Sequence, residues 1–167
     1  MRGFHGWAAI LALTVVALTA ACAAKHFDLT GVDLELTPAR AFADIGAARD
    51  RTAQWGGTVI AAVNLKDRTQ IEVLAYPLDR AGRPVVTDKP YGRVLLVRDG
   101  YLETADYSAG REVTAVGPVT GITEGRVGEA PLTYAVMQAA QIHLWPKRVP
   151  GSDEPRFHFG IGVGIIR

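Results

Sequence analysis

One cysteine is the residue of this sequence best suited to covalent chemistry. Cys22 is the single cysteine among 167 residues, so an intramolecular disulfide and a zinc site built from several cysteines are both excluded. A lone thiol can act as a nucleophile or can carry a lipid. It is reactive in an oxidising compartment unless it is modified. Cys22 is therefore the first candidate site.

Histidines and paired carboxylates could do acid–base or metal chemistry, but the sequence gives them no partners. His143 falls near the end of an expected strand, whereas His26 and His158 fall in an expected tether and tail. A catalytic or metal-binding histidine needs such partners. Glu124 and Glu129 lie in a glycine-rich loop, where solvation or an ion pair explains them. Nucleophile elbows and phosphate-binding loops are also missing, so we predict no enzyme, no metal and no cofactor.

Aromatic side chains offer a second kind of site, a face for stacking a ligand. Small barrels of the oligonucleotide/oligosaccharide-binding (OB) type bind sugars or nucleic acids on aromatic rings. Tyr91, Tyr101 and Tyr107 are the candidates for such a face. The even scatter of the aromatic residues along the chain favours packing instead. A contiguous exposed cluster of these three tyrosines would favour a binding module.

The first 21 residues have the pattern of a signal peptide. Arg2 precedes Ala8–Ala21, a run without charge that is shorter than the about 20 residues needed to span a membrane as a helix. Leu18–Cys22 resembles a lipobox, from which Thr19 departs because Leu is the common residue there. Lipidation of the cysteine is the leading interpretation. Cleavage by the ordinary signal peptidase and an uncleaved anchor are the alternatives.

Acyl chains on Cys22 would fix the protein to a membrane. Each buried methylene contributes about 0.8 kcal/mol, so one chain binds reversibly and two or more bind stably. Ala23 follows the cysteine, in place of the Asp that resembles an inner-membrane retention signal. This residue favours the outer membrane.

The charge balance argues against a nucleic-acid partner. Lys and Arg total 18 and Asp and Glu total 17; removal of residues 1–21 takes away only Arg2 and leaves 17 of each. Domains that bind nucleic acid usually carry a basic excess or stripe. We predict no nucleic-acid partner.

The rest of the chain reads as a small β domain. Thr37-Pro38 begins a short helix that continues through Ala39–Gln54. Period-two alternation then predicts strands over 58–64, 69–76, 93–98, 111–119 and 132–145. Pro118 denies a backbone donor and suggests an edge or a bulge. The expected fold is mainly β: a small closed or partly open OB-like barrel of five to six strands with one short N-terminal helix.

Four segments are expected along the chain. They are a signal peptide at 1–21, a tether at 22–36, the β domain at 37–146 and a proline-rich turn with a glycine-alternating tail at 147–167. In the tail, large apolar residues alternate over 157–165. This pattern is typical of a final strand or flap packed on the barrel; a membrane- or partner-contacting strand and disorder are the alternatives.

Several short motifs follow one another through the domain. They are Trp55-Gly56-Gly57, Asn64-Leu65, Asp67-Arg68-Thr69, Tyr76-Pro77-Leu78, Gly82-Arg83-Pro84, Asp106-Tyr107, Gly110-Arg111, Val116-Gly117-Pro118-Val119-Thr120-Gly121, Glu124-Gly125, Val127-Gly128-Glu129 and His143-Leu144-Trp145-Pro146. Over residues 37–146 this set resembles the outer-membrane lipoprotein family called Slp. The resemblance implies a lipidated Cys22, an outer-membrane location, an association with starvation or stress, and no enzymatic activity.

Three functions follow from the sequence, in order. The first is a non-enzymatic lipoprotein whose domain faces the periplasm and supports the envelope, or binds another envelope protein or component. The second is an OB-like binding module for a glycan or a small envelope ligand. The third is a hydrolase, which would require His143 to be hydrogen-bonded to a carboxylate in a cleft.

Overall fold

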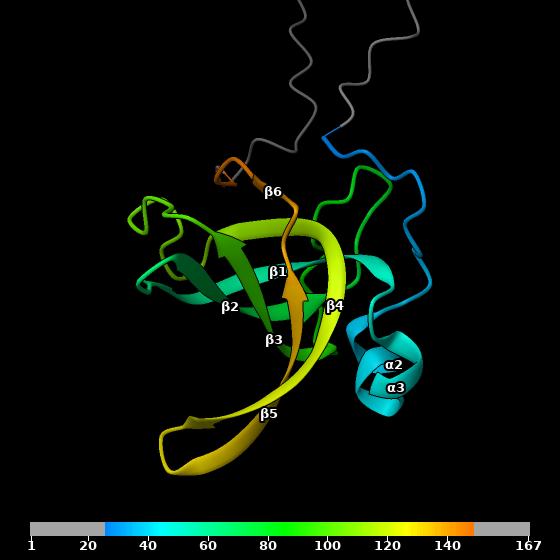
Figure 1. Cartoon of the computed structure of the whole chain (residues 1–167). Helices are drawn as coiled ribbons and strands as arrows, with labels where there is room; N and C mark the ends of the chain where they lie inside the picture. Colours follow the sequence, from blue (N-terminus) through cyan, green and yellow to red (C-terminus); the bar gives the residue numbers. More distant parts are fainter. Residues whose placement is uncertain (1–25, 149–167) are drawn as a thin grey trace, which may run out of the picture.

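The structure is a computed structural model that describes residues 26–148 (Figure 1). The predicted signal peptide, Cys22 and the alternating tail lie outside these residues. The described elements are α2 (Pro38–Ala43), α3 (Ile45–Ala48), β1 (Thr52–Asn64), β2 (Arg68–Tyr76), β3 (Gly92–Asp99), β4 (Glu112–Val127), β5 (Ala130–Gln138) and β6 (Gln141–Leu144).

Five of these strands close into a ring. The hydrogen-bonded order is β1-β2-β3-β5-β4, and β4 pairs with β1 to complete it. The β3–β5 pairing is parallel and the other ladders are antiparallel. Each of the five strands is thus paired on both sides over part of its length, which limits the unpaired edge that could recruit other chains. The prediction of a mainly β, OB-like closed sheet of five to six strands is confirmed, with two short helices in place of one.

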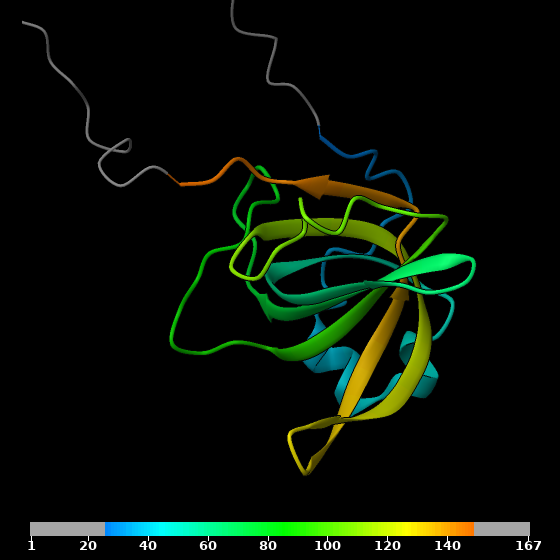
Figure 2. The same ribbon diagram turned by 90° about the vertical axis from the view of Figure 1, so that its left-hand side faces the viewer.

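β6 continues the path of β5 along β4. Residues of β5 pair with the second half of β4, and residues of β6 pair with its first half. The predicted single strand over 132–145 is therefore interrupted at Ala139, whose N–H donates to the Val97 carbonyl at 2.7 Å. Figure 2 shows β6 and the β4–β5 hairpin at opposite ends of the molecule.

The helical segment is shorter than the sequence pattern suggests. Thr37 caps α2 by accepting a hydrogen bond from the Arg40 N–H, and Asp44 then ends α2 and caps α3. The positive φ of Asp50, 63°, turns the chain into β1. The prediction of one helix through Gln54 is wrong, because the residues that follow alternate between buried and half-buried positions of a strand.

Two glycines lie inside strands and allow close packing there. A Cβ on Gly57 would lie 2.0 Å from the Leu74 carbonyl oxygen, so this glycine lets β1 and β2 approach. Gly125 lies within β4 under the ring of Tyr134, where a Cβ would be 2.5 Å from the ring edge. The predicted hairpin loop is consequently strand through Val127, and the turn begins at Gly128. A bulge does occur just after Pro118, where the β4–β5 register shifts.

The interior of the ring is filled by apolar side chains from all five of its strands. The largest that are fully buried are Trp55, Ile71, Leu96, Met137, Val59, Val73, Val94, Val113 and Val119. Burying each of the larger side chains contributes about 1.5–3 kcal/mol. The helices lie away from β6 and pack Ala41 and Ala48 against this core.

Residues 26–36, here called the N-terminal strap, pack on the ring. Phe27 and Leu36 are buried. The Asp33 N–H donates to the Thr52 carbonyl at 2.8 Å, and the Trp55 indole N–H donates to the Leu36 carbonyl at 2.7 Å. Hydrogen bonds and burial thus hold residues 26–36, the described part of the segment expected as a tether, on the domain. Within residues 26–148, no helix is long and apolar enough to cross a membrane.

Candidate functional site

The first and last described residues lie at the same end of the molecule (Figure 1). The ring of His26 lies 5.0 Å from that of Trp145, which follows β6. The start of the described chain is therefore close to the residues that follow β6. We call this the terminal end, and the polar and aromatic side chains described next gather there.

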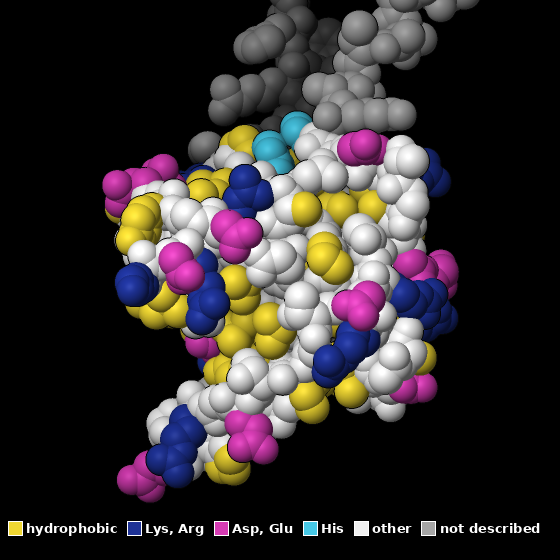
Figure 3. All heavy atoms as spheres, in the orientation of Figure 1, with side chains coloured by type: hydrophobic (Ala, Val, Ile, Leu, Met, Phe, Trp, Pro, Cys, Tyr) yellow, Lys and Arg dark blue, Asp and Glu magenta, His cyan; other side chains and the backbone are white. Residues whose placement is uncertain are grey.

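Four rings form what we call the terminal aromatic cluster: His26, Phe27, His143 and Trp145. The two imidazole centroids are 4.2 Å apart, and His143 meets Trp145 edge-on at 4.5 Å. Phe27 lies edge-on to His143 at 6.0 Å. Figure 3 shows the histidines at the upper edge of the molecule. The cluster packs the strap against β6.

His143 sits in this cluster without the partner that catalysis would need. Burial lowers the pKa of its imidazole, and the charge of His26 lowers it further. Its Nε2 is buried and has no hydrogen-bond partner. No carboxylate among the described residues hydrogen-bonds to it. The arrangement does not provide the carboxylate-paired histidine that the hydrolase hypothesis requires.

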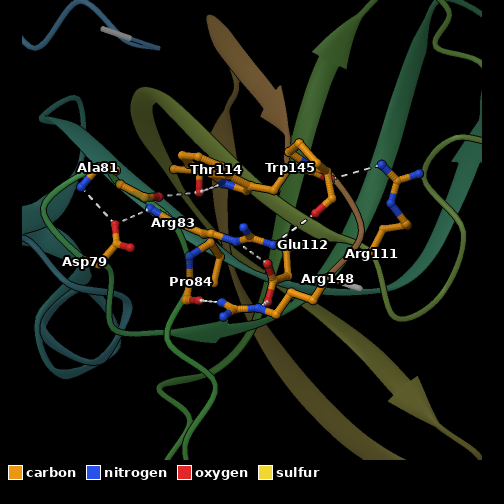
Figure 4. Close-up of polar contacts among 11 residues, drawn as sticks. Asp79, Ala81, Arg83, Pro84, Arg111, Glu112, Thr114, Trp145 and Arg148 are labelled. Carbon is orange, nitrogen blue, oxygen red and sulfur yellow. Dashed lines mark hydrogen bonds and ion pairs between the residues drawn. The ribbon is translucent and has the colours of Figure 1, made fainter. Parts of the chain in front are cut away.

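Next to the cluster, one carboxylate holds two arginines (Figure 4). Glu112 Oε2 accepts from Arg83 Nε at 2.6 Å, and its Oε1 accepts from Arg148 Nε at 2.8 Å. Each guanidinium also donates to a backbone carbonyl, that of Pro146 for Arg83 and that of Pro84 for Arg148. We call these three side chains the Glu112 network; it joins the 79–84 loop, β4 and the segment after β6.

Trp145 connects the Glu112 network to the ring. Its indole N–H donates to Thr114 Oγ1 at 2.9 Å, and the Thr114 hydroxyl donates to the Gly82 carbonyl at 2.7 Å. The Arg83 guanidinium lies 5.7 Å from the centre of the indole ring, within range of a cation–π contact. Thr114 is fully buried, so this chain of hydrogen bonds lies away from water.

Arg111 approaches Trp145 from the other side (Figure 4). Its guanidinium donates to the backbone carbonyls of Asp106, at 3.0 Å, and Trp145, at 3.1 Å. Its Nε is buried without a hydrogen-bond partner. Neither acceptor carries a full charge, and no carboxylate of the described residues forms an ion pair with Arg111. A hollow of about 340 Å³ opens here, lined by Ser108–Glu112 and Pro146–Arg148.

A larger groove runs between the strap and the 79–82 loop. Its volume is about 1060 Å³, and its lining mixes aromatic, aliphatic and amide side chains, among them Phe27, Leu34, Gln54 and Gln141. Leu34 is 58% exposed, although it is a large apolar residue. The groove therefore combines apolar surface with hydrogen-bonding groups.

The three candidate tyrosines do not form one exposed face. Tyr107 belongs to the buried core, and burial raises the pKa of its phenol. Tyr91 is half-buried against the same core. Tyr101 is 67% exposed and donates to the Lys66 carbonyl at 2.5 Å. Only Tyr101 of the three offers a solvent-exposed ring.

The two candidate carboxylates lie on the β4–β5 hairpin, far from the terminal end (Figure 1). Glu124 is in β4 opposite Thr133, and Glu129 is in the turn; both are exposed. Residues 26–148 contain no group of three or more histidine, cysteine or acidic side chains that could hold a metal ion. The arrangement at the terminal end suits binding of charged or amphipathic groups more than acid–base chemistry.

Sequence reasoning did not find the Glu112 network. Its members are separated by 29 and 36 positions and meet only because β4, the 79–84 loop and the end of β6 converge. A signal was present: the motifs Gly82-Arg83-Pro84, Gly110-Arg111 and His143-Leu144-Trp145-Pro146 all lie at this end.

Comparison with known proteins identifies the family. The model of the outer membrane lipoprotein Slp family matches residues 20–161. The uncharacterized lipoprotein YeaY of Escherichia coli (strain K12) is 36% identical over 93 residues, which are 56% of this chain and 48% of that protein. The outer membrane protein Slp of the same organism is 26% identical over 141 residues, or 83% of this chain and 74% of that protein.

A protein of Haemophilus influenzae is 29% identical over 57% of this chain and 52% of its own length, so the chain spans about half of this relative and of YeaY. Among solved structures, a small single-stranded DNA-binding protein from Streptomyces coelicolor aligns with a TM-score of 0.36 at 16% identity, over 57% of this chain and 94% of that one. Because the family model covers most of the sequence, the chain belongs to the Slp family of outer-membrane lipoproteins.

Proposed function

We propose that this protein is anchored in the outer membrane by acyl chains on Cys22, and that its domain faces the periplasm and acts by binding, not by catalysis. One observation carries the proposal: the packing of His26 on β6 and Trp145. Cys22 precedes His26 by four positions, and four extended residues reach at most about 14 Å. A lipid on Cys22 would therefore hold the terminal end close to the membrane surface.

The role in the envelope is that of a stable, membrane-held module. The closed ring and the buried hydrogen bonds around Trp145 support a rigid domain. His143 lacks a carboxylate partner among the described residues, which favours a non-enzymatic function. We infer that the domain supports envelope integrity or a stress response by contacting another envelope component.

Metabolic labelling tests the anchor. The chain and its Cys22→Ser variant are expressed in a Gram-negative host with labelled palmitate, and the membranes are fractionated. We expect label in the outer-membrane fraction for the parent chain alone, and protection of the domain from protease added to intact cells. Thr19→Leu, which restores the common lipobox residue, should label at least as well as the parent. An unlabelled, soluble periplasmic protein from both chains would overturn the proposal.

A glycan is the second candidate partner, and the groove beside the strap favours it. Sugars bind through aromatic and amide groups, and the exposed ring of His26 and the amide of Gln54 both line this groove. Co-sedimentation with purified peptidoglycan tests the idea. Gln54→Ala should weaken co-sedimentation, whereas Gln70→Ala, on β2 and outside the groove, should not. Absence of co-sedimentation of the parent chain would reject peptidoglycan as the partner.

A further inference from the structure

We propose that the hollow beside Arg111 binds the phosphate of an anionic phospholipid headgroup in the membrane that anchors the chain. The hollow is lined by Ser108–Glu112 and Pro146–Arg148. The proposal rests on the proposed anchoring of the terminal end, and it adds a ligand to that end. We call it the headgroup site.

Charge is the first argument for an anion here. Both oxygens of Glu112 are engaged by Arg83 and Arg148, so this carboxylate is not available to Arg111. Arg111 donates only to backbone carbonyls. Its guanidinium charge therefore has no counter-charge in direct contact among the described residues. A charged group held partly out of water in this way favours an anion beside it.

The donor chemistry of the lining is the second argument. A guanidinium presents five N–H groups, and Arg111 uses two of them in the contacts described above. Lys147 lines the same hollow, is exposed, and forms no ion pair with a described residue. Ser108 adds a hydroxyl. Arginine, lysine and serine are the side chains that proteins use most readily to hold phosphate oxygens.

Position is the third argument, and it selects a lipid as the source of the phosphate. Arg111 donates to the carbonyl of Trp145, and the ring of Trp145 contacts His26. Trp145 therefore lies between the headgroup site and His26, the first described residue after Cys22. Basic side chains act on a charged membrane within about a Debye length, roughly 8 Å. Anchoring at Cys22 would bring the hollow to that level.

Vesicle binding by the non-lipidated chain tests the site separately from the anchor. The Cys22→Ser protein is sedimented with vesicles of phosphatidylcholine alone or mixed with phosphatidylglycerol. We expect binding to the mixed vesicles only, weakening as salt rises. The double variant Arg111→Gln with Lys147→Gln should bind about thirtyfold more weakly. Arg111→Lys keeps the charge and should retain most of the binding.

A charge-matched control lies on distant hairpins. Lys66→Gln with Arg126→Gln removes the same two charges and should leave vesicle binding nearly unchanged. Because Arg111 also makes structural contacts, the single variant Lys147→Glu gives an independent reading and should weaken binding by itself.

Equal binding to both vesicle types, or equal loss in the distant pair, would overturn the headgroup site. Binding of inorganic phosphate without binding of vesicles would overturn a lipid as its source. Failure of palmitate labelling, by contrast, would reject the anchor. The vesicle experiment uses the non-lipidated chain, so its result would still support or overturn the headgroup site.

Discussion

At the residue scale, Glu112 is a carboxylate that pairs with two arginines. Its side chain is 11% exposed and faces Arg83, which is 24% exposed, and Arg148. Glu112→Gln would remove the charge and leave Arg83 partly buried beside a neutral amide. We expect the free energy of unfolding to fall by about 1–3 kcal/mol, measured by urea denaturation.

The matched control is another glutamate that pairs with an arginine at the surface. Glu35 and Arg40 are 83% and 64% exposed, so water screens their attraction. Glu35→Gln should change the free energy of unfolding by at most about 1 kcal/mol. Equal effects in the two variants would mean that the Glu112 network does not stabilise the terminal end.

His143 should make stability depend on pH. Burial and the charge of His26 lower the pKa of folded His143 below the ordinary histidine value of 6.5. As the pH falls through 6.5, the unfolded chain binds a proton before the folded chain does. The contribution of His143 is thus complete above this pH and is lost progressively below it.

Replacement of the His143 imidazole tests the direction of this pH dependence. We expect the free energy of unfolding to drop less between about pH 7.5 and about pH 5 in His143→Gln than in the parent chain. His26→Gln removes the smaller cause alone and should give an intermediate drop. A parent drop no larger than that of His143→Gln would contradict the shifted pKa.

At the element scale, the approach of β1 to β2 depends on a missing side chain. A Cβ on Gly57 would meet the Leu74 carbonyl, which is backbone and cannot turn away. Gly57→Ala should lower the free energy of unfolding by about 1–3 kcal/mol. Gly46→Ala in α3, where the nearest atom would be 3.4 Å away, should be neutral or stabilise by up to about 1 kcal/mol. The thermal midpoint of Gly57→Ala should lie below that of the parent chain, and that of Gly46→Ala should lie at or above it.

Period-two alternation located the strands better than their ends. Each of the five predicted ranges contains a strand, although 132–145 is divided between β5 and β6, because each range needs one face for the core. Glycine misled the boundaries: Gly57 and Gly125 permit close packing within strands and do not end them. The sequence predicts a helix through Gln54 because alanine and arginine suit a helix. In the structure Gln54 pairs with Val116, and this pairing makes it part of β1. Pairing across 62 positions cannot be seen in local pattern.

The sequence predicts the family of this chain but not the side chains that meet at the terminal end. The Slp resemblance is confirmed by the family match. Lipidation of Cys22 stays a prediction, because that residue lies outside the described part of the chain. Tyr107 illustrates the limit of sequence reasoning: aromatic residues suit both a ligand face and a core, and only the fold places this ring inside. The Glu112 network could not be predicted either, because it forms only where three segments that are distant in the sequence meet in the fold.

At the scale of the whole molecule, function depends on which end faces the membrane. The described chain begins and finishes at one end of the molecule, and the β4–β5 hairpin extends at the other (Figures 1 and 2). If acyl chains hold Cys22 as proposed, the four positions between it and His26 would leave the domain little freedom to turn over. With the anchor proposed at Cys22, the headgroup site would face the membrane side, while the hairpin would point toward the periplasm.

Fluorescence quenching in vesicles tests this orientation. The lipidated chain carries one added cysteine, Ala81→Cys beside the groove or Glu129→Cys at the hairpin, labelled with the same dye. Lipids with a quencher on the headgroup should quench the dye at 81 and spare the dye at 129. Ten Gly/Ser residues inserted after Ala24 add a coil of roughly 18 Å and should reduce the difference. Equal quenching at both positions of the unextended chain would show that the terminal end does not face the membrane.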